Sequence, residues 1–351
     1  RSELALDWCE ALLAAGDVAT ATKAIGELDR FVGDSDRLRA WHTCFAGQHT
    51  VLTAPEGLQE TADTVAAAAE ALASQDDPAG EAKGHFVYAL ALARLGRVGA
   101  CEAALDRALA AARRGAGDRR RANTVLALAP LAALWGPSPV TRASGRCLDV
   151  VRVLRITQGA PAVEAVALSC QGVLEALRGR TDAARRMIAS SRKMVEELGV
   201  TQRVLEVDVF SGLLDLFEGD ADSAERTLRG AYQGLRDLGL GVDAARAAAL
   251  LARALLAQNR VVDAEKLSHE SEALAGDDLK AAIAWRGARA EALARRGEHE
   301  AAVGLATAAV EIAATTDALV DHADARLALA AALRAAGTHA TADAEERRAR
   351  E

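Results

Sequence analysis

The chain has 351 residues, of which 51% are apolar and only 3% are aromatic. Its formal net charge is −8 with acids and bases interspersed, which argues against a dedicated nucleic-acid-binding protein, since such proteins usually carry a basic face. No apolar run approaches the roughly 18 residues of a membrane span. The apolar residues are largely Ala and Leu, which lose little entropy in a helix, so the composition predicts an all-α protein.

The five cysteines are odd in number and lack CxxC spacing, so we interpret them as small core residues in a reducing, cytoplasmic compartment. They are Cys9, Cys44, Cys101, Cys147 and Cys170. The chain begins at Arg1 without Met or a signal peptide, and it ends inside a predicted helix. These ends indicate a piece of a longer polypeptide.

A turn residue followed about five positions later by a small residue recurs along the whole chain. In chain order the pairs are Gly16 and Ala21, Gly96 and Cys101, Gly136 and Thr141, Gly179 and Ala184, Gly219 and Ala224, Asn259 and Ala264, Gly297 and Ala302, and Gly337 and Ala342. A weaker copy without Gly centres near Thr61. The copies follow one another at about 40 residues, which predicts nine helical hairpins over residues 1–351, the last one truncated.

Small residues also recur seven positions before the turn and twelve positions after it, as at Gly212 and Ala231. Small side chains at these places let paired helices approach closely, so we expect the central alanines of the second helices to be buried at helix crossings. Those alanines are Ala184, Ala224, Ala264 and Ala302.

Two stretches in the first half could carry chemistry. "WHTCFAGQH", residues 41–49, contains His42, Cys44 and His49, but Cys44 points about 200° away from His42 on a helix, so one metal ion would struggle to collect all three. We interpret the stretch as packing of Trp41 and predict no metal. The four tryptophans are read as core wedges between hairpins rather than as platforms for a ligand: Trp8, Trp41, Trp135 and Trp285.

The densest positive charge lies in "RRGAGDRRR", residues 113–121, and continues in the next helices. The arginines are Arg113, Arg114, Arg119, Arg120, Arg121, Arg142, Arg146, Arg152 and Arg155. We interpret them as a solvated face paired with acids and helix C-termini. Two alternatives stay open: docking to an acidic partner or to a domain of the same parent protein, and contact with phosphate or nucleic acid. The GxG in this stretch is read as a turn between hairpins, because no strand precedes it.

The step between the fourth and fifth hairpins is longer, about 43 residues, and contains "TQGAPAVE" with Gly159 and Pro161. We expect a change of superhelix curvature near 158–162. A second weak point is "FVGDSD", residues 31–36, beside the irregular second repeat.

The pattern resembles the tetratricopeptide repeat, with a small residue at position 8, Gly near 15, Ala at 20 and a small residue at 27. It departs from that family in its period of about 40 rather than 34 and in lacking most aromatic signatures. The long-period form resembles the repeat arms of large bacterial signalling proteins, namely LuxR-type regulators with a nucleotide-binding ATPase and relatives with a class III nucleotide cyclase. The resemblance implies a right-handed α-solenoid of about nine tetratricopeptide-like hairpins.

The resemblance also implies where a partner would bind, because the first helix of each pair lines the concave face of such arrays. The candidate groove residues are Leu126, Val173, Val209, Leu213, Leu216, Arg246, Arg253, Glu291 and Arg334. We expect a groove that is apolar in the middle and polar toward the C-terminus, suited to a peptide. The alternative is that the longer helices pack these apolar residues against each other and close the groove.

Enzyme motifs are absent: the chain has no GxxxxGK[ST], HExxH or GxSxG. We therefore predict a non-enzymatic interaction and sensor arm of a bacterial regulator, with no cofactor, no direct nucleic-acid binding and no membrane contact. Its partner would be a protein, a peptide or another domain of the parent protein. The alternatives are a passive assembly scaffold and, with least support, a hydrolase or transferase whose site lies between hairpins.

Overall fold

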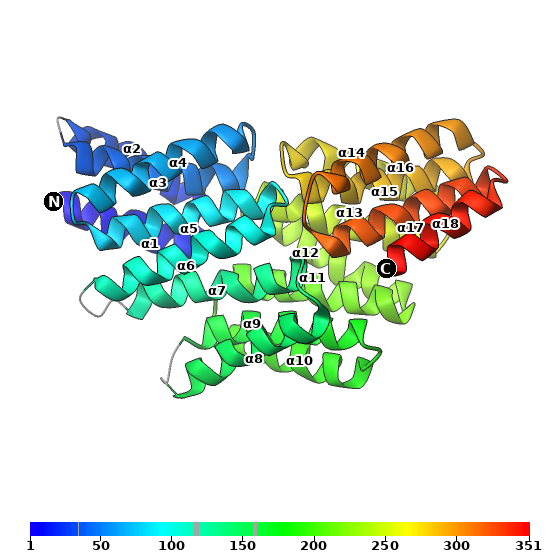
Figure 1. The fold of residues 1–351 in the computed structure, drawn as a ribbon, viewed down its shortest axis with the longest axis horizontal. Helices are drawn as coiled ribbons and strands as arrows, with labels where there is room; N and C mark the ends of the chain where they lie inside the picture. Colours follow the sequence, from blue (N-terminus) through cyan, green and yellow to red (C-terminus); the bar gives the residue numbers. More distant parts are fainter. Residues whose placement is uncertain (34, 116–118, 157–159) are drawn as a thin grey trace.

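The computed structural model describes residues 1–33, 35–115, 119–156 and 160–351, and within these ranges every regular element is an α-helix. The eighteen described helices form nine antiparallel pairs that stack into an α-solenoid, as the repeat pattern predicts (Figure 1). None of these helices has the length and apolar composition that a bilayer crossing requires.

The first five hairpins are α1 (Ser2–Ala15) with α2 (Val18–Val32), α3 (Asp36–Thr53) with α4 (Leu58–Ser74), α5 (Pro78–Arg94) with α6 (Val98–Arg114), α7 (Arg119–Trp135) with α8 (Val140–Ile156), and α9 (Pro161–Leu177) with α10 (Thr181–Glu197). The last four are α11 (Thr201–Glu218) with α12 (Ala221–Asp237), α13 (Gly241–Ala257) with α14 (Val261–Ala275), α15 (Leu279–Arg295) with α16 (His299–Ala314), and α17 (Leu319–Ala335) with α18 (His339–Arg350).

Seven of the eight predicted turns within hairpins have a left-handed residue at the end of the first helix. Gly219 has φ 79°, and Asn259 takes the same conformation with φ 61°. The following amide then bonds back to the last turn of the helix, as Asp220 N does to Asp215 O at 2.9 Å. This bond satisfies a carbonyl that the helix end would leave without a partner.

The fourth hairpin departs from the predicted pattern. Gly136 is followed by Pro137, and it is not among the residues with positive φ. The two prolines of "GPSP" delay the start of α8 to Val140, four residues after the glycine rather than two. The predicted anchor Thr141 is therefore wrong: it is exposed, and Ala143 is buried in its place.

The second repeat also differs in its anchor, because Ala62 is fully buried and Thr61 is only half-buried. Its turn uses Gly57, with φ 67°, at the beginning of α4 rather than at the end of α3. The predicted change of curvature near 158–162 and the predicted turn in "RRGAGDRRR", residues 113–121, fall partly on residues outside the described ranges. The same holds for "FVGDSD", because Asp34 is not described.

Small residues bring the paired helices together as expected. Ala184, Ala224, Ala264 and Ala302 are all buried. A methyl group added at Gly212 would lie 2.4 Å from Leu228 Cγ on the facing helix, so the two helices touch where the side chain is missing. Ser191 and Ser271 occupy equivalent places and donate to Ala165 O and Ala245 O at 2.7 Å, which satisfies both buried hydroxyls. All five cysteines are buried and free.

The superhelix turns far enough to bring its second and third hairpins beside its seventh to ninth hairpins (Figure 1). Asp317 accepts from Gly99 N at 2.8 Å and also from Val98 N, so it caps the beginning of α6 from another hairpin. Asp277, forty residues earlier, accepts from Gly57 N at 2.7 Å at the beginning of α4. We call this set the inter-turn contact.

Arg94 is the third member of the inter-turn contact. It extends from α5 to Asp243 of α13 at 2.7 Å and to Asp278, just before α15, at 3.5 Å. Burial raises the pKa of Asp278, and the charge of Arg94 opposes that rise. The contact thus holds charged groups between two segments that are about 150 residues apart in sequence.

Candidate ligand-binding pocket

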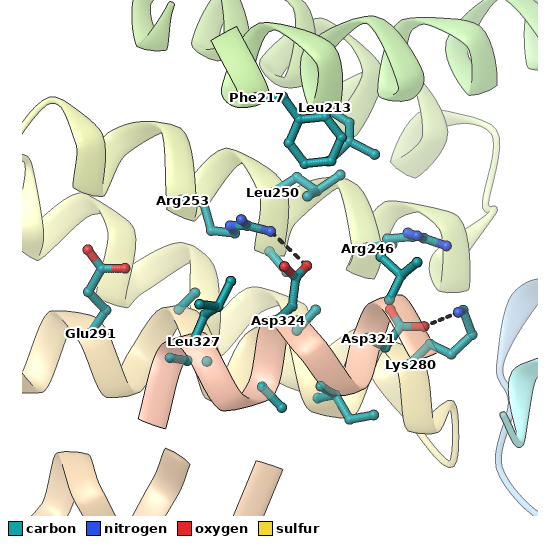
Figure 2. Close-up of a pocket in the computed structure, with 18 of the residues that line it drawn as sticks. Leu213, Phe217, Arg246, Leu250, Arg253, Lys280, Glu291, Asp321, Asp324 and Leu327 are labelled. Atoms are coloured by element: carbon teal, nitrogen blue, oxygen red, sulfur yellow. Dashed lines mark hydrogen bonds and ion pairs between the residues drawn. The ribbon is translucent and has the colours of Figure 1, made fainter. Parts of the chain in front are cut away.

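A cavity of about 170 Å³ lies on the inner face of the C-terminal half of the solenoid (Figure 2). Every residue that lines it comes from the first helix of a hairpin, namely α7, α9, α11, α13, α15 and α17. This placement agrees with the expectation that first helices form the concave face. The fold therefore collects side chains from six hairpins around one space.

One part of the cavity is apolar. Val173 and Leu213 form its floor and are almost fully buried, with exposed fractions of 1% and 6%. Leu177, Phe217 and Leu327 line it as well, but they are partly exposed to solvent. Their exposed fractions are 42%, 40% and 46%, respectively. Large apolar side chains that face solvent around one cavity are typical of a binding site rather than of a closed core.

The other part is charged, with acidic and basic residues from α13, α15 and α17. Lys280 forms a buried ion pair with Asp321, and Arg253 forms a partly exposed ion pair with Asp324 at 3.1 Å (Figure 2). Glu291, toward the other end of the cavity, pairs with Arg295 on its own helix. These pairs neutralise all three acidic residues of the cavity wall and two of its three basic residues.

Trp135 of α7 lines the charged end, where two cations lie over its ring. The guanidinium carbon of Arg246 lies 3.9 Å from the centre of the Trp135 ring system, and Lys280 Nζ lies 4.9 Å from it. Both cations are attracted by the electron-rich face of the indole. Burial lowers the pKa of Lys280, Asp321 opposes this effect, and the nearby charge of Arg246 reinforces it.

Five of the nine candidate groove residues line this cavity: Val173, Leu213, Arg246, Arg253 and Glu291. The other four do not. Val209 and Leu216 pack against the central hydrophobic core, and Leu126 is half-buried on α7. Arg334 turns toward α18, where it pairs with Asp343 at 2.9 Å and with Glu346.

Several cavity residues were missed from sequence, among them Leu177, Phe217, Lys280 and Asp321. Leu177 and Phe217 each lie four residues after a predicted groove residue, Val173 and Leu213. The cavity face thus follows the i, i+4 spacing of a helix rather than position 12 of the shorter repeat. That spacing is the signal that could have identified them.

The tryptophans do not all behave as predicted. Trp41 and Trp285 are buried, as expected for core wedges, and Trp135 is buried but also forms the wall of the cavity. The prediction for Trp8 is wrong, because 41% of this residue is exposed on α1. Trp8 lies one turn after Leu4, which is 74% exposed, so this face of α1 contacts nothing in the described part of the chain that would bury it.

The other candidate clusters serve the fold. Cys44 is buried, while His49 shares a hydrogen bond of 2.9 Å with Thr22. No group of three or more His, Cys, Asp or Glu side chains in the described ranges is placed to hold a metal ion. Of the arginine cluster, Arg114, Arg146, Arg152 and Arg155 pair with acidic residues, and the side chains of Arg119, Arg120 and Arg121 lie outside the described part.

The fold is that of tetratricopeptide-like helical-repeat proteins. A Rap protein complexed with Competence and Sporulation Factor is similar over 99% of this chain and 96% of its own, with 11% identity and a TM-score of 0.70. Aspartyl phosphate phosphatase F from Bacillus subtilis is similar over 100% and 93%, with 12% identity and a TM-score of 0.57. The apo form of the quorum sensor NprR from B. thuringiensis is similar over 99% and 97%, with 10% identity and a TM-score of 0.52.

No protein-family model matches the chain. No curated protein sequence matches it either. At these identities the similarity to the solved structures establishes the fold alone.

Proposed function

We propose that this chain is a non-catalytic sensor arm that binds a peptide in the inner-face cavity. The observation that carries the proposal is the exposed apolar rim of Leu177, Phe217 and Leu327 beside fixed charged groups on one concave surface. Apolar contacts give a peptide its affinity, and the charges fix its direction. Of the nine candidate groove residues, the five that line the cavity belong to this proposal.

The similar structures support a binding role. One of them holds Competence and Sporulation Factor, and another is a quorum sensor. The finer context is part of the proposal too: the resemblance of the repeats implies a bacterial regulator of the LuxR type or an ATPase-linked cyclase. A ligand held by helices from six hairpins would resist changes in the curvature of the solenoid, which gives the arm a way to pass a signal to a parent protein.

A selection of random peptides on the purified chain tests this function. We expect peptides whose binding, measured by fluorescence polarisation, weakens at least about tenfold in Phe217→Asp and Leu327→Asp, because each change places a charge in the apolar rim. Leu213→Asp is a poorer test, because Leu213 is nearly buried and the variant would also lose stability.

Val262→Asp is the matched control, because Val262 is 77% exposed on α14 and does not line the cavity. It should bind the selected peptides as the unchanged chain does. A passive scaffold would yield no peptide that depends on the rim. Equal binding by all four proteins would therefore contradict the sensor and favour the scaffold.

A further inference from the structure

The charged end of the cavity carries one positive charge that no acidic residue pairs with. Asp321 and Asp324 are engaged by Lys280 and Arg253, and Glu291 is engaged by Arg295. Arg246 forms no ion pair with any carboxylate in the described part of the chain, and its contact with Trp135 is a cation–π interaction. Arg246 is therefore the one basic residue of the cavity wall that no carboxylate in the described part of the chain pairs with.

The surroundings of Arg246 make this lack of a partner costly. Lys280 lies over the same indole, so two cations share one ring. Another carboxylate that interacts electrostatically with Arg246, that of Asp278, is already engaged by Arg94 and caps α15 through Ala281 N at 2.8 Å. The charge of Arg246 acts against the charged form of Lys280, and a bound anion beside Arg246 would offset this repulsion.

The position of Arg246 also suits the end of a bound peptide rather than its middle. Figure 2 shows Arg246 and Lys280 at one end of the pocket and Glu291 at the other, with Phe217, Leu250 and Leu327 between these ends. Trp135 forms the wall beside Arg246. A peptide whose chain stops there avoids the wall and places its terminal carboxylate beside the guanidinium, which can hold both carboxylate oxygens.

We infer that Arg246, held over the Trp135 ring, receives the C-terminal carboxylate of a peptide whose last apolar side chains lie against Phe217 and Leu327. The inference rests on the proposed function, because it names the chemical end of the peptide that the same cavity takes. It also sets the direction of the peptide, with its amino end toward Glu291.

The test compares two probes, acetyl-Leu-Ala-Leu with a free carboxylate and the same tripeptide as its C-terminal amide. Binding is followed by NMR through the indole N–H resonance of Trp135, assigned with Trp135→Phe. We expect the free acid to bind at least about tenfold more tightly than the amide, because a charge-assisted pair with arginine is lost in the amide.

Two matched variants locate the effect. Arg246→Gln should bind acid and amide equally, whereas Arg286→Gln should keep the preference for the acid. Arg286 is a suitable control because it lies over another indole, that of Trp285, at 4.1 Å, and does not line the cavity. Melting curves establish that both variants are folded.

Three outcomes would overturn the inference: equal binding of acid and amide by the unchanged chain, a preference that survives in Arg246→Gln, or no binding of the acid at millimolar concentration. These outcomes are distinct from failure of the proposed function. If selected peptides still depend on Phe217 and Leu327, the cavity remains a peptide site and only the assignment of Arg246 falls.

Discussion

A missing side chain determines how closely two helices approach in this solenoid, and Gly212 shows the effect most clearly. A Cβ at Gly212 would lie 2.4 Å from Leu228 Cγ and 2.7 Å from its Cδ2. We expect Gly212→Ala to lower the free energy of unfolding by about 1–3 kcal/mol, because α11 and α12 must separate or Leu228 must leave its rotamer. Chemical denaturation monitored by circular dichroism measures this change.

The control is Gly230→Ala on α12. Nothing lies within 4 Å of the methyl group that this change adds, and Gly230 is exposed in a helix. Alanine is the better helix former by roughly 0.5–1 kcal/mol, so this variant should be more stable than the unchanged chain. Two identical substitutions on facing helices thus have opposite expected signs. Destabilisation of equal size in both would show that the contact at Gly212 is not the cause.

The hairpins themselves could be predicted from sequence, because each depends on local chemistry. A left-handed Gly or Asn ends the first helix, and a small residue such as Ala224 follows within the second. The exception at Ala143 has a local cause as well, since two prolines lengthen the turn. Five of the candidate groove residues line the cavity, because the same positions of each first helix face the inner side of the solenoid in successive hairpins.

The inter-turn contact could not be predicted in this way. Asp277 precedes a helix that begins with "LKAAIAW", and an acidic residue at such a place is predicted to cap the helix that follows it. In the structure Asp278 caps that helix, and Asp277 instead accepts from Gly57 N of a distant hairpin. Such pairing depends on how far the whole solenoid has turned, and a repeat of about 40 residues does not specify this.

At the scale of elements, α6 begins with a cap supplied from another hairpin. Its residue before the helix, Arg97, offers no side-chain cap, and Asp317 accepts from Val98 N and Gly99 N instead. We expect Asp317→Ala to speed hydrogen exchange of these two amides roughly fivefold, because loss of a cap costs about 1 kcal/mol. Asp317→Asn should have a smaller effect, since its amide oxygen still accepts.

Asp220→Ala is the control, because Asp220 caps α12 through Ser223 N within its own hairpin, at 3.0 Å. It should speed exchange at Ser223 and leave Val98 and Gly99 unchanged. Unchanged exchange at Val98 and Gly99 in Asp317→Ala would mean that α6 does not depend on the distant cap in solution.

At the scale of the whole molecule, the inter-turn contact holds one turn of the solenoid against the next together with apolar contacts. Val18 of α2 is buried in the core of the C-terminal half, and Ala318, just before α17, is buried in the core of the N-terminal half. We expect that the turn can open without unfolding a helix, because each hairpin packs mainly on its neighbours in sequence. Asp278 takes part in the contact through Arg94 and caps α15, and Lys280 of the cavity wall lies two residues further along. We therefore expect opening of the turn to change the shape of the cavity through the beginning of α15.

The variant Arg94→Gln/Asp277→Ala/Asp317→Ala tests this coupling. Loss of the Arg94 charge alone should destabilise the closed form of the turn by about 3–5 kcal/mol. It leaves Asp243 and Asp278 as carboxylates without an arginine partner in a largely buried place. Opening of the turn lets both carboxylates reach water, so the open form is favoured. We expect a larger radius of gyration by small-angle X-ray scattering and an unchanged helical signal by circular dichroism.

The comparison variant is Asp17→Ala/Asp220→Ala, which removes two caps that act within single hairpins, through Thr20 N and Ser223 N. It should lower the melting temperature and leave the radius of gyration as it is. If the triple variant kept the compact dimensions of the unchanged chain, apolar contacts between the turns would suffice to hold them. If it lost helical signal together with its compactness, the hairpins would depend on closure, and the arm could not move by opening this turn alone.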